Sequence, residues 1–96
     1  MALGGGFRLW YLIEMKYHVV LKPRAIKDLK DLPKEEASKI IDRLALLEDN
    51  LKGDVKRLTH VTPEYRMRSG NYRVLFELEE DRIIVYRIEH RKDIYR

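Results

Sequence analysis

The side chains best suited to chemistry lie in the second half of the chain, and most of them are arginines. Eight of the eleven arginines occupy residues 57–96, whereas lysines predominate before them. Arginine presents a planar fork of donors that fits a phosphate group, and surface lysine more often serves solubility. The chain closes on EHRKDIYR, which contains Arg91 and Tyr95. Either these two residues return to a phosphate-binding site built by preceding strands, or they belong to a solvated basic tail.

Composition restricts the class of protein. A chain of 96 residues is long enough for one domain with one core. Hydrophobic residues make up 45% and charged residues 38%, which fits a compact, highly charged globule. The absence of cysteine excludes disulfides and thiolate metal sites and fits a reducing compartment, so we expect a cytoplasmic protein. The net charge of +4 weakly favours polyanionic partners.

The first fourteen residues, MALGGGFRLWYLIE, differ from those that follow. Their apolar run, from Phe7 to Ile13, is far shorter than the roughly 20 residues that span a bilayer. It also shows no clear charged start and no clear small-residue cleavage site, which a signal peptide would need. We therefore expect no membrane partner, an N-terminal extension over residues 1–14 and a domain over residues 15–96. The alternative for the extension is an added strand or a partner-binding segment.

The first half of the domain has the pattern of a strand and a helical hairpin. Residues 16–21, KYHVVL, form a short β-rich run. Pro23 suits the first position of a helix, and Pro33 ends that helix and opens another. Apolar residues recur at helical spacing in both segments, at Ala25, Ile26, Leu29 and Leu32 and then at Ala37, Ile40, Ile41, Leu44 and Leu47. The hairpin must lay this apolar side on another layer.

The second half predicts that layer. Three β-rich runs, at residues 64–68, 71–78 and 82–88, are separated by segments short enough for hairpins. Between Gly53 and Pro63 no strand is clear. The expected fold is α+β, with an N-terminal strand and an antiparallel helical hairpin packed on one face of a small, mainly antiparallel twisted sheet.

Alternation along the strands assigns each residue to a face of this sheet. The residues expected to face the helices are Tyr65, Met67, Tyr72, Val74, Phe76, Leu78, Ile84, Tyr86 and Ile88. Those expected on the open face are Arg66, Arg68, Arg73 and Arg87, with Ile83 and Val85. Like charges on neighbouring strands destabilise a sheet, and a bound phosphate would offset that cost. The alternative is an ordinary charged face on which arginines cover the sheet with their stems.

This order of elements, over residues 15–96, resembles the RelE/ParE superfamily of toxins from type II toxin–antitoxin systems. The matching stretches are KRL at 56–58, YRMR at 65–68, SGNYR at 69–73 and HRKDIY at 90–95. The closing H-R-x-x-x-Y is similar to the RelE branch of mRNA interferases, since ParE-type gyrase inhibitors generally lack that Arg and Tyr.

The resemblance implies a metal-independent endoribonuclease that cleaves mRNA in the ribosomal A site and so inhibits translation and growth. RNA supplies its own nucleophile, the 2′-hydroxyl, and the enzyme must deprotonate it, neutralise the phosphorane and protonate the leaving oxygen. By the resemblance Tyr95 is the general base, and Arg73 and Arg91 stabilise the charge. The implied RNA-binding residues are Arg66, Arg68, Arg87, His90, Lys56 and Arg57. For His90 proton donation, stacking on a base and plain packing all stay open.

The resemblance also implies the partners, namely a cognate antitoxin, mRNA and the ribosome with its rRNA. No His/Asp/Glu cluster has metal-ligand spacing, and Gly70 reads as a turn residue rather than as part of a phosphate loop. We therefore expect no metal and no small-molecule cofactor. Two alternatives use the same scaffold: a ParE-like, non-enzymatic inhibitor of DNA gyrase, and a catalytically inactive relative that binds RNA or the antitoxin.

Overall fold

The computed structural model describes residues 16–94. The extension expected at residues 1–14 and the candidate base Tyr95 lie outside these residues. The elements, in chain order, are β1 (His18–Leu21), α2 (Pro23–Lys30), α3 (Lys34–Leu47), β2 (Val55–Arg57), β3 (Tyr65–Ser69), β4 (Tyr72–Glu79), β5 (Arg82–His90) and α4 (Arg91–Ile94).

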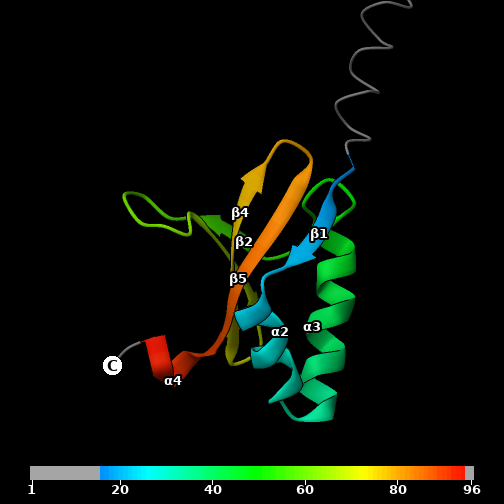
Figure 1. Ribbon diagram of the computed structural model, residues 1–96, viewed down its shortest axis with the longest axis vertical. Helices are drawn as coiled ribbons and strands as arrows, with labels where there is room; N and C mark the ends of the chain where they lie inside the picture. The colour runs from blue at the N-terminus through cyan, green and yellow to red at the C-terminus, as the bar shows by residue number, and fades with distance from the viewer. Residues whose placement is uncertain (1–15, 95–96) are drawn as a thin grey trace, which may run out of the picture.

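The strands form one five-stranded sheet in the order β1-β5-β4-β3-β2. β1 runs parallel to β5, and every other pair is antiparallel. Helices α2 and α3 lie together on one side of this sheet, whereas α4 and the loop between β2 and β3 extend toward the other side (Figure 1). This arrangement confirms the predicted α+β fold. Among the described residues, no helix is long and apolar enough to cross a membrane.

The helical hairpin packs as its apolar spacing predicted. Pro23 occupies the first turn of α2, and Pro33 precedes α3 as its N-cap residue. On α3 the residues Ile40, Leu44 and Leu47 are buried, because their spacing places them on one face. They meet the buried side chains of the three central strands, Met67, Val74, Phe76, Ile83, Val85 and Ile88. This single core holds one face of the sheet against the hairpin.

The predicted faces of β5 are partly wrong, because the strand contains a β-bulge. The pairing with β4 shifts between Leu75 and Phe76, so that Phe76 lies opposite Val85 while Val74 lies opposite Ile88. One extra residue on β5 reverses the alternation on the N-terminal side of the bulge. Ile83 and Val85, expected outside, are therefore fully buried in the core. Ile84 and Tyr86, expected inside, belong to the opposite face.

Two short elements have no clear sequence signal. β2 is a three-residue edge strand that pairs with β3, and its Val55 packs against the core. α4 begins immediately after β5, where the backbone N–H of Arg91 donates to the carbonyl of Asn71 at 2.6 Å. This bond places the start of α4 beside the turn between β3 and β4.

Candidate functional site

The sheet face turned away from α2 and α3, which we call the open face, carries two rows of aligned side chains. The strand register defines the first row as Lys56, Arg66, Leu75 and Arg87. It defines the second row as Arg68, Arg73 and Glu89. Neighbours within a row are about 5 Å apart across the strands, and the rows are separated by two residues along each strand. The predicted gathering of Arg66, Arg68 and Arg73 on one face is confirmed.

Arg73 stands at the centre of the second row and is the buried cation of the site. Only 5% of its surface is exposed. Its Nε and Nη1 atoms are buried and find no hydrogen-bond partner in the described part of the chain. A buried charge without a partner is costly, and proteins retain one mainly where function needs it. Phosphate oxygens are suitable acceptors for both nitrogens.

The neighbours of Arg73 add positive charge. Arg68 is exposed and lies directly opposite Arg73, and Arg66 is half-buried two residues along β3. Within residues 16–94, neither Arg66 nor Arg68 has a carboxylate partner. Arg91 is exposed at the start of α4, next to the end of the Arg68–Arg73 row. Arg66, Arg68 and Arg73 therefore form a region of unpaired positive charge on β3 and β4, and the backbone of Arg91 begins α4 beside it.

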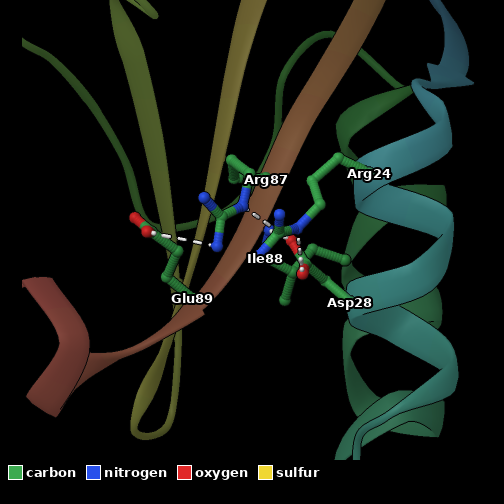
Figure 2. A network of polar contacts seen from close by, with 5 residues as sticks. All are labelled: Arg24, Asp28, Arg87, Ile88 and Glu89. Atoms are coloured by element: carbon green, nitrogen blue, oxygen red, sulfur yellow. Dashed lines mark hydrogen bonds and ion pairs between the residues drawn. The ribbon is translucent and has the colours of Figure 1, made fainter.

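Arg87 reaches the open face but is already paired. Its Nε donates to Asp28 Oδ2 at 3.0 Å, and its Nη2 lies 3.5 Å from Glu89 Oε2. Figure 2 shows the Arg87 guanidinium between these two carboxylates, one from α2 and one from its own strand. The sequence prediction grouped Arg87 with the RNA-binding arginines. The structure instead surrounds it with acidic groups.

Asp28 joins α2 to the part of β5 that β1 does not cover. Its carboxylate accepts from the Ile88 backbone N–H at 2.9 Å, from Arg87 and, at 3.2 Å, from Arg24 Nε. Burial by itself would raise the pKa of Asp28. The hydrogen bonds from Ile88, Arg87 and Arg24 outweigh burial and lower the pKa below its ordinary value. Asp28 is therefore ionised at neutral pH. Its carboxylate takes up the Ile88 N–H at the edge of β5 where no neighbouring strand is present among the described residues.

The remaining predicted residues fall in different places. Lys56 is exposed in the first row, and its predicted contact to RNA stays a prediction. Arg57 is neutralised by Glu64, with Nε and Oε1 2.6 Å apart, and this contact raises its pKa. His90 lies opposite Tyr72, and their rings meet edge to face at 5.0 Å. Alternation puts this pair on the side of the sheet that carries the core, away from Arg73.

Two carboxylates of the site escaped the sequence reasoning. Asp28 is about sixty residues from its partners on β5, so no local pattern connects them. Glu89 could have been found, because it stands two residues after Arg87 and alternation gives both the same face. Glu77, which alternation along β4 places on the same face as Arg73, accepts a hydrogen bond from the Glu64 backbone N–H at 2.6 Å. It anchors the loop between β2 and β3.

Comparison with known proteins gives consistent results. The family model described as ParE toxin of type II toxin–antitoxin system, parDE, matches residues 19–95. The RelE1 protein of Methanocaldococcus jannaschii is 39% identical over 88 residues, which cover 85% of this chain and 98% of that protein.

Two solved structures extend the likeness to the fold. The toxin in the RelB–RelE antitoxin–toxin complex from Methanococcus jannaschii aligns with a TM-score of 0.68 and 34% identity, covering 79% of this chain and 94% of that chain. The archaeal RelE–RelB complex from Pyrococcus horikoshii OT3 gives a TM-score of 0.65 and 27% identity, with coverages of 80% and 97%.

Proposed function

The chain belongs to the ParE toxin family of type II toxin–antitoxin systems, and on this premise we propose that it is a RelE-type endoribonuclease that cleaves mRNA on the ribosome. The supporting observation is Arg73, a buried guanidinium with two unpartnered nitrogens on a face of unpaired arginines. A scissile phosphodiester is an anion whose oxygens accept hydrogen bonds from a guanidinium group, as this position requires. In this proposal Lys56, Arg66, Arg68 and Arg73, the cations of the two rows that have no carboxylate partner among the described residues, bind the message and orient it.

Catalysis would rest on charge stabilisation by arginine. Attack of the 2′-hydroxyl on the adjacent phosphorus places additional negative charge on the phosphoryl oxygens. Arg73 would stabilise that charge, because its guanidinium is desolvated and its Nε and Nη1 have no competing acceptor among the described residues. Arg68, Arg66 and Lys56 would hold the flanking phosphates along β3 and β2. No metal enters this scheme.

Arg91 and Tyr95 would complete the site from the C-terminal segment. Arg91 begins α4 next to the Arg68–Arg73 row, which suits a second contact to the phosphorane or to the leaving oxygen. Tyr95 would be the general base, by the match of the closing H-R-x-x-x-Y to the RelE branch. An unperturbed phenol ionises near pH 10, and adjacent guanidinium groups favour the phenolate. A base of this kind needs the arginines beside it.

A cognate antitoxin is the second proposed partner. The RelE relatives were solved as complexes with RelB antitoxins. For this chain we propose an acidic antitoxin segment that covers the open face, where Arg66, Arg68 and Arg73 lack carboxylate partners among the described residues. Such a segment would compete with RNA for the same arginines and so inhibit cleavage.

The test is cleavage of a defined mRNA on purified ribosomes, followed by primer extension. Arg73→Ala should reduce the cleavage rate at least about 100-fold, since it removes a donor to the developing charge. Arg82→Ala is the matched control, because Arg82 is exposed and paired with Glu79 at the far end of β5, and it should stay within about twofold. Tyr95→Phe should lose cleavage while the fold persists. Full cleavage by Arg73→Ala and Tyr95→Phe would refute the nuclease proposal.

A second candidate, inhibition of DNA gyrase, is favoured by the ParE description of the matching family model. In this case the helical hairpin would matter more than the open face. Induction in cells separates the two candidates. Rapid loss of protein synthesis supports the nuclease, whereas a DNA-damage response with normal translation supports gyrase inhibition.

A further inference from the structure

Arg73 and Glu89 stand directly opposite each other on β4 and β5, yet they form no ion pair. Residues opposite each other in an antiparallel pair have Cβ atoms about 5 Å apart, well within reach of an arginine and a glutamate. An Arg–carboxylate pair is among the strongest side-chain contacts, because the fork can bind both oxygens. A nearby carboxylate that does not pair with a buried, unsatisfied guanidinium therefore requires an explanation.

The explanation lies in Arg87. Its Nη2 lies 3.5 Å from Glu89 Oε2, so that Glu89 is turned along its own strand rather than across to β4. The other side of the guanidinium is fixed by Asp28, which also accepts the Ile88 N–H and is only 11% exposed at its side chain. Figure 2 shows this line of Asp28, Arg87 and Glu89, which leads from α2 onto the open face.

We propose that Arg87 is a positioning residue that holds Glu89 away from Arg73 and so keeps Arg73 available for a phosphate of bound RNA. The inference rests on the proposed function for the identity of the anion. If Glu89 were released, it would pair with Arg73 Nε and Nη1 and compete with the phosphate for the same donors. Arg87 itself is engaged by two carboxylates and is a poor phosphate contact.

A double-mutant cycle on RNA binding tests this role. The probe is a short single-stranded RNA with 2′-O-methyl groups, which binds through its phosphates and resists cleavage, with affinity read by fluorescence anisotropy. Arg87→Gln should weaken binding roughly tenfold in the wild-type background but about twofold or less in the Glu89→Gln background. A direct contact between Arg87 and RNA, or a long-range charge effect, would give the same loss in both backgrounds, and that result would overturn the proposal.

Two further variants keep the test decisive. Arg82→Gln removes the same charge from the same strand and should show no coupling to Glu89→Gln, since Arg82 pairs with Glu79. If Arg87→Gln does not fold, Arg87→Lys replaces it. Lysine keeps the charge but has one nitrogen, so it cannot bridge Asp28 and Glu89 as arginine does, and it should weaken binding severalfold only when Glu89 is present.

A crystal structure of Arg87→Gln separates this inference from the proposed function. We expect the Glu89 carboxylate to lie within 4 Å of an Arg73 nitrogen, whatever anion the protein uses. If the wild-type protein binds no RNA but this new contact is seen, the nuclease proposal fails and the role of Arg87 stands. If the wild-type protein binds RNA and Glu89 keeps its orientation in the variant, the role of Arg87 is refuted.

Discussion

Replacement of Asp28 by alanine should destabilise the fold by about 2 kcal/mol, although the residue is a charged side chain on a short helix. The largest part of this cost arises from the Ile88 N–H, which would lose its acceptor at a partly buried edge of β5. The contact with Arg87 adds about 1 kcal/mol, because that side chain is one-third exposed. Arg24 adds little, since it is 59% exposed. Relief of burial and the better helix propensity of alanine offset part of the loss.

Urea denaturation at pH 7 measures the change, and pH identifies its origin. The pKa of Asp28 is lower in the folded than in the unfolded protein. Its charge therefore stabilises the fold fully above the unfolded value, near pH 4, and this part is lost as pH falls through the folded pKa. Asp28→Asn keeps an oxygen that can accept the Ile88 N–H. It should cost about 1 kcal/mol at neutral pH, and the cost should shrink in acid.

Asp42→Ala is the matched control for this prediction. Asp42 is exposed on α3 and has no partner within residues 16–94, and its replacement gives the same gain in helix propensity. It should change stability by less than about 0.5 kcal/mol. Equal effects of Asp28→Ala and Asp42→Ala would show that the carboxylate does not stabilise β5. A pH-independent difference for Asp28→Asn would refute the charged contribution alone.

Two further predictions concern the turn and the face of the site. Gly70 has φ +61°, a left-handed conformation that strains residues with a side chain, whereas a Cβ there would make only an ordinary contact, 3.8 Å from Glu36 Oε2. Gly70→Ala should therefore lower the free energy of unfolding by about 1 kcal/mol in urea denaturation, and Gly70→Asn by less. Equal stability of all three proteins would contradict this. Arg68→Ala should lower the slope of log affinity against log salt for single-stranded RNA by about 0.7, the value for one lost phosphate contact. An unchanged slope would place Arg68 off the RNA path.

The fold was predictable wherever the chain keeps a regular period. The apolar spacing of α3 and the alternation of β3 and β4 predicted the correct faces, because each segment turns its apolar side to the one core between the hairpin and the sheet. β5 departs from this rule. Its bulge is a backbone feature that changes which residues face the core, and no residue type near Tyr86 marks it. Ile83 and Val85 are buried, although strict alternation from Ile88 puts them outside.

The candidate site was predictable in its cations but not in their pairing. Alternation alone placed Arg66, Arg68 and Arg73 on one face. It could not show that Arg73 is nearly buried, because burial depends on how the neighbouring side chains close over it. Nor could it show that Arg87 is neutralised, because Asp28 approaches from a helix at the other end of the chain. Tertiary contacts decide both properties.

Pairing divides the arginines into two groups with different consequences for nucleic-acid binding. Three arginines pair with carboxylates three to seven residues away, namely Arg24 on α2, Arg57 on β2 and Arg82 on β5. Among the described residues, Arg87 differs in pairing with two carboxylates, Asp28 from the distant helix α2 and Glu89, which lies opposite Arg73. The positive potential near Arg66, Arg68 and Arg73 is therefore stronger than a net charge of +4 suggests, because acidic residues pair with arginines in other parts of the molecule.

This division also explains why the open face tolerates like charges. Arg68 and Arg73 repel each other across β3 and β4, and the nearest carboxylate that could relieve them, Glu89, is held by Arg87. The hydrophobic core on the other face of the same strands, where Met67 and Val74 are fully buried, offsets this repulsion. A sheet selected for stability alone would pair Glu89 with Arg73. Keeping them apart through a third residue, itself anchored on α2, is the arrangement expected of a surface that must stay open to an anion.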